Sequence, residues 1–220
     1  KGKCRIENIP NISDILRCYD ILELLGAKIT KLSPNEIEID CSNIEEKEIP
    51  LDMTKKFRAS YYFIGALLSR FGRASVGFPG GCNFGSRPID QHIKAFEALG
   101  AKVVVAQGKV TAKAKKMVGT SIYMDVVSVG ATINAMLAAV LAEGTTTIDN
   151  AAKEPHIVDV ANFLNTMGAD IRGAGTDVIK IRGVKVMHGA DYAIIPDQIE
   201  AGTFMVAAAA TRGDIVIKNV

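Results

Sequence analysis

The sequence predicts an α/β fold, an inside-out α/β barrel in which three repeated βαβαββ units bury their helices and place their sheets outside. The first observation is a repeat of about seventy residues, marked by a Gly-Ala pair at Gly26, Gly100 and Gly168. The second is an amphipathic helix within each unit, and the third is a more uniformly apolar helix between units. Together these features indicate similar units packed around buried helices.

Each unit runs in the same order: strand, loop, helix, Gly-Ala turn, strand, turn and strand. The units are most alike over residues 4–40, 74–113 and 146–181. In the second unit, Ile93, Phe96 and Leu99 recur at helical spacing, which predicts a helix with one buried face. The glycine that follows such a helix suits the left-handed backbone conformation in which many helices end. The Gln107-Gly108 pair then predicts a hairpin turn between two strands.

Long apolar stretches lie between the units and after the last one. They occupy residues 60–72, 130–144 and 201–213. Because they are apolar on nearly all sides, we expect them to form helices that are packed inside a domain rather than lying on its surface.

The pattern restarts after the third unit, because residues 214–220, DIVIKNV, repeat the strand pattern of residues 4–10, CRIENIP. We therefore divide the chain into a cysteine-loop domain at 1–200 and the start of a fourth unit at 201–220, which belongs to a second domain. The units of the first domain cover about 1–57, 58–127 and 128–200. We expect a longer protein in which a similar helix precedes Lys1. In the present chain, helix 201–211 is expected to dock where that preceding helix belongs.

Composition narrows the class of protein. Of 220 residues, 48% are hydrophobic and 23% are charged, which is typical of a globular protein with a sizeable core. The 26 basic and 24 acidic residues nearly balance, and no basic run is interleaved with aromatic residues, so we expect no nucleic-acid partner. The longest apolar segment, 204–210, is too short to span a membrane, and the N-terminal residues lack the apolar core of a secretory signal. We therefore expect a cytoplasmic protein without a membrane partner.

The chain has four cysteines: Cys4, Cys18, Cys41 and Cys82. None belongs to a CxxC pair or has a histidine at metal-ligand spacing, so no metal site is predicted and no cofactor is expected. This cysteine usage favours a reduced, cytosolic setting.

One cysteine has unusual neighbours. Cys82 lies in the loop GFPGGCNFGSRPIDQ, residues 77–91, among Gly80, Gly81 and Gly85, with Arg87 just beyond. An accessible thiol near a cation has a pKa below its free value of about 8.5 and is correspondingly reactive. Taken alone, the pattern more often marks an incidental loop thiol than a catalyst.

Several separated motifs carry a more specific signal: FRAS at 57–60, FPGGCNFGSRPID at 78–90, SVGAT at 128–132 and IEAGTF at 199–204. In this order the motifs resemble the UDP-N-acetylglucosamine enolpyruvyl transferase (1-carboxyvinyltransferase) family. The repeat alone would also fit the related shikimate-pathway enolpyruvyl transferase or an RNA 3′-phosphate cyclase-like protein, and the PGGC loop decides against these two.

The resemblance implies an enolpyruvyl transferase-like fold and a defined reaction. The enolpyruvyl group of phosphoenolpyruvate is transferred to the 3′-hydroxyl of UDP-N-acetylglucosamine, and phosphate is released. This is the first committed step of bacterial peptidoglycan synthesis, on which cell wall biogenesis, cell shape and cell division depend, and the antibiotic fosfomycin targets the enzyme in the cytoplasm.

The resemblance also implies roles for individual residues. Cys82 is the general acid that protonates the methylene carbon of phosphoenolpyruvate and can form a covalent adduct with it, and Arg87 contacts the phosphate of phosphoenolpyruvate. Arg58 contacts the nucleotide sugar. The uracil ring is held by Pro88, Ile89, Asp90 and Gln91. The diphosphate is received by Val126, Val127, Ser128, Val129 and Gly130, although many relatives carry a lysine in place of Val126.

Each of these residues also has a simpler interpretation. Arg58 and Arg87 are potential surface ion-pair partners, Ser128 and Asp90 are potential helix caps, and the three histidines are interpreted as structural or solvated. The family's sugar-activating base lies outside the chain, so we expect the chain to be inactive without its second domain. A nucleotide-sugar binding module without catalysis, and a purely structural scaffold, remain as alternative functions.

Overall fold

The structure, a computed structural model, describes residues 2–55, 57–80, 88–218 and 220. The first part contains β1 (Lys3–Glu7), α1 (Ser13–Leu24), β2 (Lys28–Ser33), β3 (Glu36–Asp40) and the short helix α2 (Leu51–Thr54). The second contains the 3-10 helix η1 (Arg58–Tyr61), α3 (Tyr62–Phe71), β4 (Arg73–Gly77), α4 (Asp90–Ala98), β5 (Lys102–Ala106), β6 (Lys109–Lys113) and β7 (Ser121–Tyr123). The third contains α5 (Val129–Ala139), β8 (Thr145–Asp149), α6 (Pro155–Thr166), β9 (Asp170–Arg172), β10 (Val178–Arg182) and β11 (Asp191–Ala193), and α7 (Gln198–Thr211) follows.

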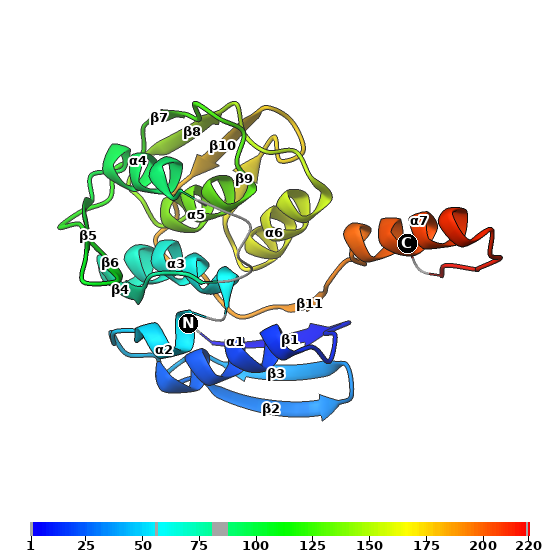
Figure 1. Ribbon diagram of the computed structural model, residues 1–220. Coiled ribbons are helices and arrows are strands. Elements are labelled where there is room, and N and C mark those ends of the chain that lie inside the picture. Colours follow the sequence, from blue (N-terminus) through cyan, green and yellow to red (C-terminus); the bar gives the residue numbers. More distant parts are fainter. Residues whose placement is uncertain (1, 56, 81–87, 219) are drawn as a thin grey trace.

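Three sheets lie on the outside of the molecule, and each takes one segment from the preceding unit (Figure 1). Their strand orders are β11-β1-β3-β2, β4-β6-β5 and β7-β8-β10-β9. The strands within a unit pair antiparallel, whereas β11 is parallel to β1 and β7 is parallel to β8. Ile49 completes the pattern through an isolated parallel bridge to Val76 in β4. The chain therefore closes into a ring in which the last unit pairs with the first.

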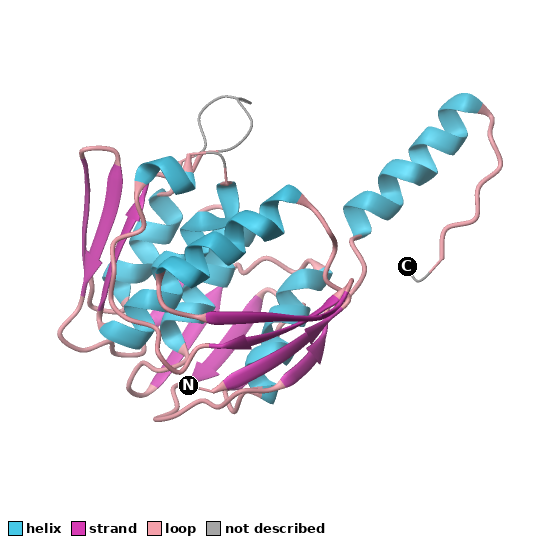
Figure 2. Cartoon of the chain, turned by 90° about the horizontal axis from the view of Figure 1, so that it is seen from below, coloured by secondary structure: helices cyan, strands magenta, loops and turns pink. Residues whose placement is uncertain are grey.

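Apart from α7, the long helices lie between these sheets (Figure 2), and α3 and α5, labelled in Figure 1, pack against each other near the centre. Nearly every residue of α5 is buried, and α3 buries four apolar or glycine positions. Inward-facing side chains alternate with exposed ones in strands such as β10, as expected for sheets with one face on a core. One apolar cluster joins the central helices with α1, α4, α6 and the inner faces of two sheets, β4-β6-β5 and β7-β8-β10-β9. The β11-β1-β3-β2 sheet has a second, smaller cluster around Ile6, Ile9 and Ile37. The predicted inside-out α/β arrangement is confirmed.

The two central helices touch without intervening side chains at Gly65 of α3. A Cβ added to Gly65 would lie 2.7 Å from the backbone oxygen of Asn134 and 2.9 Å from its Oδ1. The Asn134 side chain is fully buried and satisfied at both ends. Its Oδ1 accepts the N–H of Gly65 at 3.1 Å, and its Nδ2 donates to the carbonyl oxygen of Gly130 at 3.1 Å. This amide thus joins α3 to the first turn of α5.

The turns follow the sequence pattern. Gly26, Gly100 and Gly168 have φ values of 101°, 97° and 96°, the region that the prediction required at the ends of the helices. Gln107 and Gly108 both have positive φ, 52° and 71°, and link β5 to β6 in the predicted hairpin.

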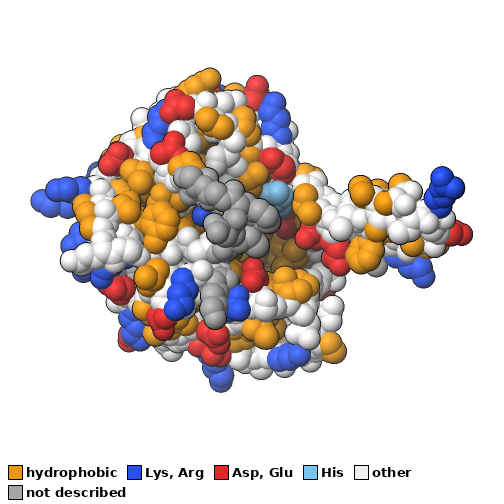
Figure 3. All heavy atoms as spheres, viewed as in Figure 1, with side chains coloured by type: hydrophobic (Ala, Val, Ile, Leu, Met, Phe, Trp, Pro, Cys, Tyr) orange, Lys and Arg blue, Asp and Glu red, His pale blue; other side chains and the backbone are white. Residues whose placement is uncertain are grey.

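The expected docking of helix 201–211 is wrong. Helix α7 projects from the ring as a separate arm, and its apolar side chains are open to solvent (Figure 3). Among its residues only Ala201 is buried, whereas Phe204 and Met205 are more than half exposed. Residues 194–197 alone separate β11 from α7, and the Asp197 carboxylate accepts the N–H of Ile199 at 2.8 Å, so the helix begins at the rim of the ring and points outward.

The predicted strand at 214–220 does not form in the described residues 214–218, which have no regular structure. A strand needs a neighbour with which to exchange hydrogen bonds, and β11 already occupies the open edge of β1. Among the described residues, no helix is both long enough and apolar enough to cross a membrane.

The contact at Gly65 generates a stability prediction. Gly65→Ala places a methyl group against the Asn134 backbone, so we expect the free energy of unfolding to fall by about 1–3 kcal/mol. Urea unfolding followed by circular dichroism measures this change. Gly202→Ala is the control, because a Cβ at Gly202 of α7 meets nothing within 4 Å and alanine favours a helix. Equal unfolding midpoints for Gly65→Ala and the unmodified chain would contradict the prediction.

Candidate active site

The starts of three helices meet at one place in the structure. Tyr61 at the end of η1 and His92 in the first turn of α4 have ring centroids 5.0 Å apart and are nearly perpendicular, at 85°. Gly130 in the first turn of α5 lies against both rings, since a Cβ built there would be 2.5 Å from Tyr61 Oη and 2.8 Å from His92 Nε2. The segments at 58, 88–91 and 126–130, which the resemblance connects with the substrate, are therefore neighbours.

Arg58 contributes a positive charge to this place. Its guanidinium carbon lies 5.3 Å from the centroid of the Tyr61 ring, within the range of a cation–π contact. Within the described ranges, no carboxylate forms an ion pair with Arg58. The alternative interpretation of Arg58 as a surface ion-pair partner is therefore not supported by the described residues. Its half-buried guanidinium is available to an anion.

His92 is buried at the centre of the cluster, with 5% of its surface exposed. Neither ring nitrogen has a hydrogen-bond partner in the part of the chain that the structure describes. Burial, followed by the nearby charge of Arg58, lowers the pKa of His92 from its ordinary value to about 4, although Asp90 acts in the opposite direction. The imidazole is therefore neutral near pH 7.

The start of α5 is open to solvent and carries a helix cap. The Oγ of Ser128 accepts the N–H of Ala131 at 3.3 Å, which makes Ser128 the N-cap, as one of its two interpretations predicted. Val126 and Val127 precede it and are 66% and 52% exposed. A helix N-terminus carries a partial positive charge and free N–H groups, so this segment can receive an anion.

The start of α4 alternates between exposed and buried residues. Pro88 and Asp90 are exposed, whereas Ile89 and Gln91 are buried. The interpretation of Asp90 as the helix cap is wrong, because Ile89 occupies the N-cap position and Asp90 is the first residue of α4. Its Oδ2 instead accepts the Nε2–H of Gln91 at 2.9 Å, and this hydrogen bond is the main cause that lowers the pKa of Asp90.

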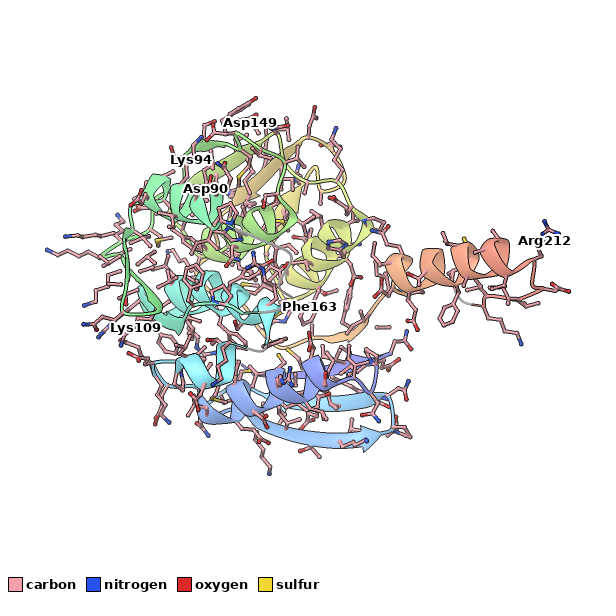
Figure 4. All side chains as sticks on the ribbon, viewed as in Figure 1. Asp90, Lys94, Lys109, Asp149, Phe163 and Arg212 are labelled. Carbon is pink, nitrogen blue, oxygen red and sulfur yellow. The ribbon has the colours of Figure 1, made fainter. Side chains whose placement is uncertain are left out.

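Asp125 links the last two segments. Its backbone N–H donates to Gln91 Oε1 at 3.0 Å, and its carboxylate accepts from Lys94 Nζ at 2.6 Å and from Gln91 Nε2 at 3.3 Å. Figure 4 labels Asp90 and Lys94 on α4, where this network begins. The hydrogen bond from Lys94, followed by that from Gln91, lowers the pKa of Asp125.

Cys82 and Arg87 lie outside the described residues, between Gly80 and Pro88. The other three cysteines are half-buried free thiols. Burial raises the pKa of Cys18 to about 11 and also raises the pKa of Cys41. Both thiols therefore stay almost entirely protonated at neutral pH, and because the thiolate is the reactive form, they are poor nucleophiles.

Sequence reasoning missed three residues of this cluster: Tyr61, His92 and Asp125. Tyr61 and His92 each lie within one helical turn of a predicted contact residue, which is the signal that could have found them. The described part of the chain contains no group of three or more histidine, cysteine or acidic side chains placed to hold a metal ion.

The buried His92 predicts a pH effect on stability. Below its ordinary pKa of 6.5, the unfolded chain gains a proton that the folded chain does not bind, so the free energy of unfolding falls as the pH decreases from 6.5 toward 4. Arg58 and Asp90 are the charged groups that act on the ring. We expect His92→Phe, which keeps an aromatic ring against Tyr61, to reduce this slope by up to about 1.4 kcal/mol per pH unit.

Urea unfolding of both proteins between pH 7 and 5 measures the two slopes. His188→Gln is the matched control, because His188 lies on the surface and its replacement should leave the slope unchanged. Identical slopes for His92→Phe and the unmodified chain would show that His92 is not held neutral.

Comparison with known proteins agrees with this fold and with the resemblance. The family model of EPSP synthase (3-phosphoshikimate 1-carboxyvinyltransferase) matches residues 1–220. Over its 220 residues the chain is 58% identical to UDP-N-acetylglucosamine 1-carboxyvinyltransferase of Clostridium botulinum (strain ATCC 19397 / Type A) and 60% identical to UDP-N-acetylglucosamine 1-carboxyvinyltransferase 2 of Clostridium acetobutylicum. It covers 53% and 52% of these proteins, and thus spans about half their length.

Solved structures show the same fold. The enolpyruvyl transferase NikO from Streptomyces tendae superposes with a TM-score of 0.80 at 26% identity, over 94% of this chain and 49% of NikO. EPSP synthase from Acinetobacter baumannii, at 20% identity, superposes with a TM-score of 0.74 over 95% of this chain and 48% of that enzyme, and shows the fold alone. Because the family model covers the chain from its first residue to its last, the chain belongs to the EPSP synthase family.

Proposed function

We propose that this chain is the cysteine-loop half of an enzyme that transfers the enolpyruvyl group of phosphoenolpyruvate to the 3′-hydroxyl of UDP-N-acetylglucosamine and releases phosphate. The observation that carries the proposal is the meeting of Arg58, the start of α4 and the start of α5 around His92. The two clostridial relatives are named UDP-N-acetylglucosamine 1-carboxyvinyltransferases, and this name supports the choice of substrates.

The described residues supply groups suited to an anionic sugar nucleotide. Arg58 offers a cation without an acidic partner in the described ranges, and α5 offers its N-terminus behind the exposed Val126 and Val127. Segment 88–91 lies beside them and would hold the uracil ring. The neutral His92 adds no charge to the cluster, so Arg58 and the helix end determine its attraction for anions.

The chemical step is assigned to the loop outside the described residues. We propose that Cys82 donates its proton to the methylene carbon of phosphoenolpyruvate, and that Arg87 holds the phosphate of that substrate through paired hydrogen bonds. Covalent capture of phosphoenolpyruvate or fosfomycin by the Cys82 sulfur follows from the same reactivity. The reaction would serve peptidoglycan synthesis in the cytoplasm, and therefore cell wall biogenesis and cell division.

We propose further that residues 1–200 form the cysteine-loop domain and that 201–220 begin a second domain. The ring of sheets is complete at β11, and α7 stands outside it with an apolar surface like that of a helix from a domain core. The activity would then need the second domain, because the chain covers about half of its relatives' length.

A nucleotide-sugar binding module is the second candidate for this chain in isolation. It is favoured by the described site residues, which offer a cation and a helix N-terminus suited to binding, whereas the proposed catalytic Cys82 lies outside the described residues. The shikimate-pathway enzyme is a weaker alternative. The clostridial proteins that are 58% and 60% identical to this chain are named UDP-N-acetylglucosamine 1-carboxyvinyltransferases, whereas the EPSP synthase of solved structure is only 20% identical.

Binding of UDP-N-acetylglucosamine, measured by titration calorimetry on this chain, tests the proposal. We expect Arg58→Gln to weaken binding about tenfold or more, because a charge-assisted contact is lost. Arg182→Gln makes the same chemical change on an exposed position of β10 and should bind as the unmodified chain does. Absence of binding, or equal affinity of Arg58→Gln, would contradict the proposal. Phosphate release after phosphoenolpyruvate is added, measured on a chain that also contains the second domain, separates a transferase from a binding module.

Thiol labelling tests the role of Cys82. With limiting iodoacetamide or fosfomycin we expect Cys82 to react first, because burial raises the pKa of Cys18 and Cys41. Digestion and mass spectrometry follow each thiol with time. Cys82→Ser should remove the fast phase and Cys4→Ser should keep it. Equal labelling of all four thiols, or faster labelling of Cys4, would contradict an activated loop thiol.

A further inference from the structure

The Gln91 side chain uses both ends of its amide between two segments of the candidate site. Its Oε1 accepts the backbone N–H of Asp125 at 3.0 Å, and its Nε2 donates to Asp90 at 2.9 Å and to the Asp125 carboxylate at 3.3 Å. Only 8% of Gln91 is exposed. We call these contacts of Gln91 with Asp90 and Asp125 the Gln91 clasp.

The clasp joins two stretches that are distant in sequence. Asp90 begins α4, whereas Asp125 directly precedes the exposed Val126 and the α5 start. Lys94 on α4 also holds the Asp125 carboxylate, but both partners of that ion pair are well exposed, and such pairs contribute little. The buried amide is therefore the stronger link between α4 and the 126–130 segment.

The segment between β7 and α5 is also attached to the third sheet, through Met124. The N–H of Met124 donates to the carbonyl oxygen of Asp149 at 3.0 Å, and Asn150 Nδ2 donates to the carbonyl oxygen of Met124 at 2.8 Å. These bonds fix residue 124 to the third sheet. Gly130 is held against His92 of α4 by packing, but neither contact determines the separation between the exposed residues 126–128 and α4, and the clasp supplies that restraint.

At neutral pH the chemistry of the clasp fits an amide better than leucine or glutamate, which are of similar size. Two carboxylates, Asp90 and Asp125, face Gln91 Nε2, so a donor is needed on this end. The backbone N–H of Asp125 faces Gln91 Oε1, so an acceptor is needed at the other end of the side chain. Leucine satisfies neither requirement, and ionised glutamate satisfies only the second while adding a third negative charge.

We propose that Gln91 is a positioning residue that sets the distance between the 88–90 segment and residues 126–128, which precede α5, so that one nucleotide diphosphate can contact both. This rests on the proposed function, because it presumes that one ligand spans the two segments. The side chain acts through Asp125 and the loop that follows, and the main chain of residue 91 stays free for its own contact.

Affinity for UDP-N-acetylglucosamine at pH 8 is the first measurement, by titration calorimetry on this chain. We expect Gln91→Leu to weaken binding about tenfold, the effect of losing the hydrogen bonds of one buried amide. Asn162→Leu is the matched control, because it replaces an exposed amide on α6 by leucine away from the cluster, and its affinity should not change. Equal affinity of Gln91→Leu and the unmodified chain would overturn the proposal.

Gln91→Glu gives a readout that general destabilisation would not produce. Near pH 8 its carboxylate opposes Asp90 and Asp125, and we expect binding at least as weak as that of Gln91→Leu. Two neighbouring carboxylates raise the pKa of the new glutamate, so protonation toward pH 5 restores a donor and should restore most of the affinity. Arg58, His92 and Lys94 also face this region, and the ratio to the unmodified chain at each pH removes their contribution. A ratio that does not change with pH contradicts the proposal.

Hydrogen exchange of the Asp125 amide in the ligand-free chain separates this proposal from the proposed function. We expect exchange about tenfold faster in Gln91→Leu, whereas the Ala131 amide, which donates to Ser128, should not change. If the unmodified chain binds the nucleotide sugar but the Asp125 amide is unaffected by Gln91→Leu, the clasp alone is refuted. If the unmodified chain does not bind, the proposed function fails, and the positioning role fails with it.

Discussion

The close contact between α3 and α5 is the constraint on which the rest of the structure depends. The packing at Gly65 leaves no room for a side chain. The buried Asn134 amide accepts a hydrogen bond from Gly65 of α3 and donates one to Gly130 of α5. One of these bonds ends on Gly130, which also lies against Tyr61 and His92. The crossing that builds the core therefore also fixes the first turn of α5 in the candidate site, so core packing and site geometry cannot vary independently.

The electrostatics of the site follow from the same arrangement. Several helices start in one place, and their N-termini bring partial positive charge without any ionised group. The Asp125 carboxylate is paired with Lys94, the Asp90 carboxylate accepts a hydrogen bond from Gln91, and burial keeps His92 neutral. Arg58 then remains as the charge without an acidic partner in the described ranges. Arg58 and the helix N-termini are therefore the groups that can attract a ligand with negative charge, although the net charge of the chain is only +2.

Much of the fold could be predicted because its signals are local. Turn residues such as Gly100 and Gln107 have the backbone conformations that their positions require. Ring closure could not be predicted in this way, since the partners Asn8 and Ile194 are 186 positions apart and no local pattern links them. The apolar sequence of α7 indicated a need for burial but could not name a partner. In the site, burial of His92 arises from tertiary packing, and no sequence pattern separates a main-chain contact of Gln91 from a side-chain clasp.

The parallel pairing of β11 with β1 has a consequence for synthesis of the chain on the ribosome. One edge of β1 can pair with β3 as soon as residue 40 is available, because only α1 and β2 lie between the two strands in the sequence. The other edge must wait for residues 191–193. During that interval it offers unpaired N–H and C=O groups to any other nascent chain. The sheet whose strands emerge first is thus the last to be completed, and the long loop that it closes favours slow folding.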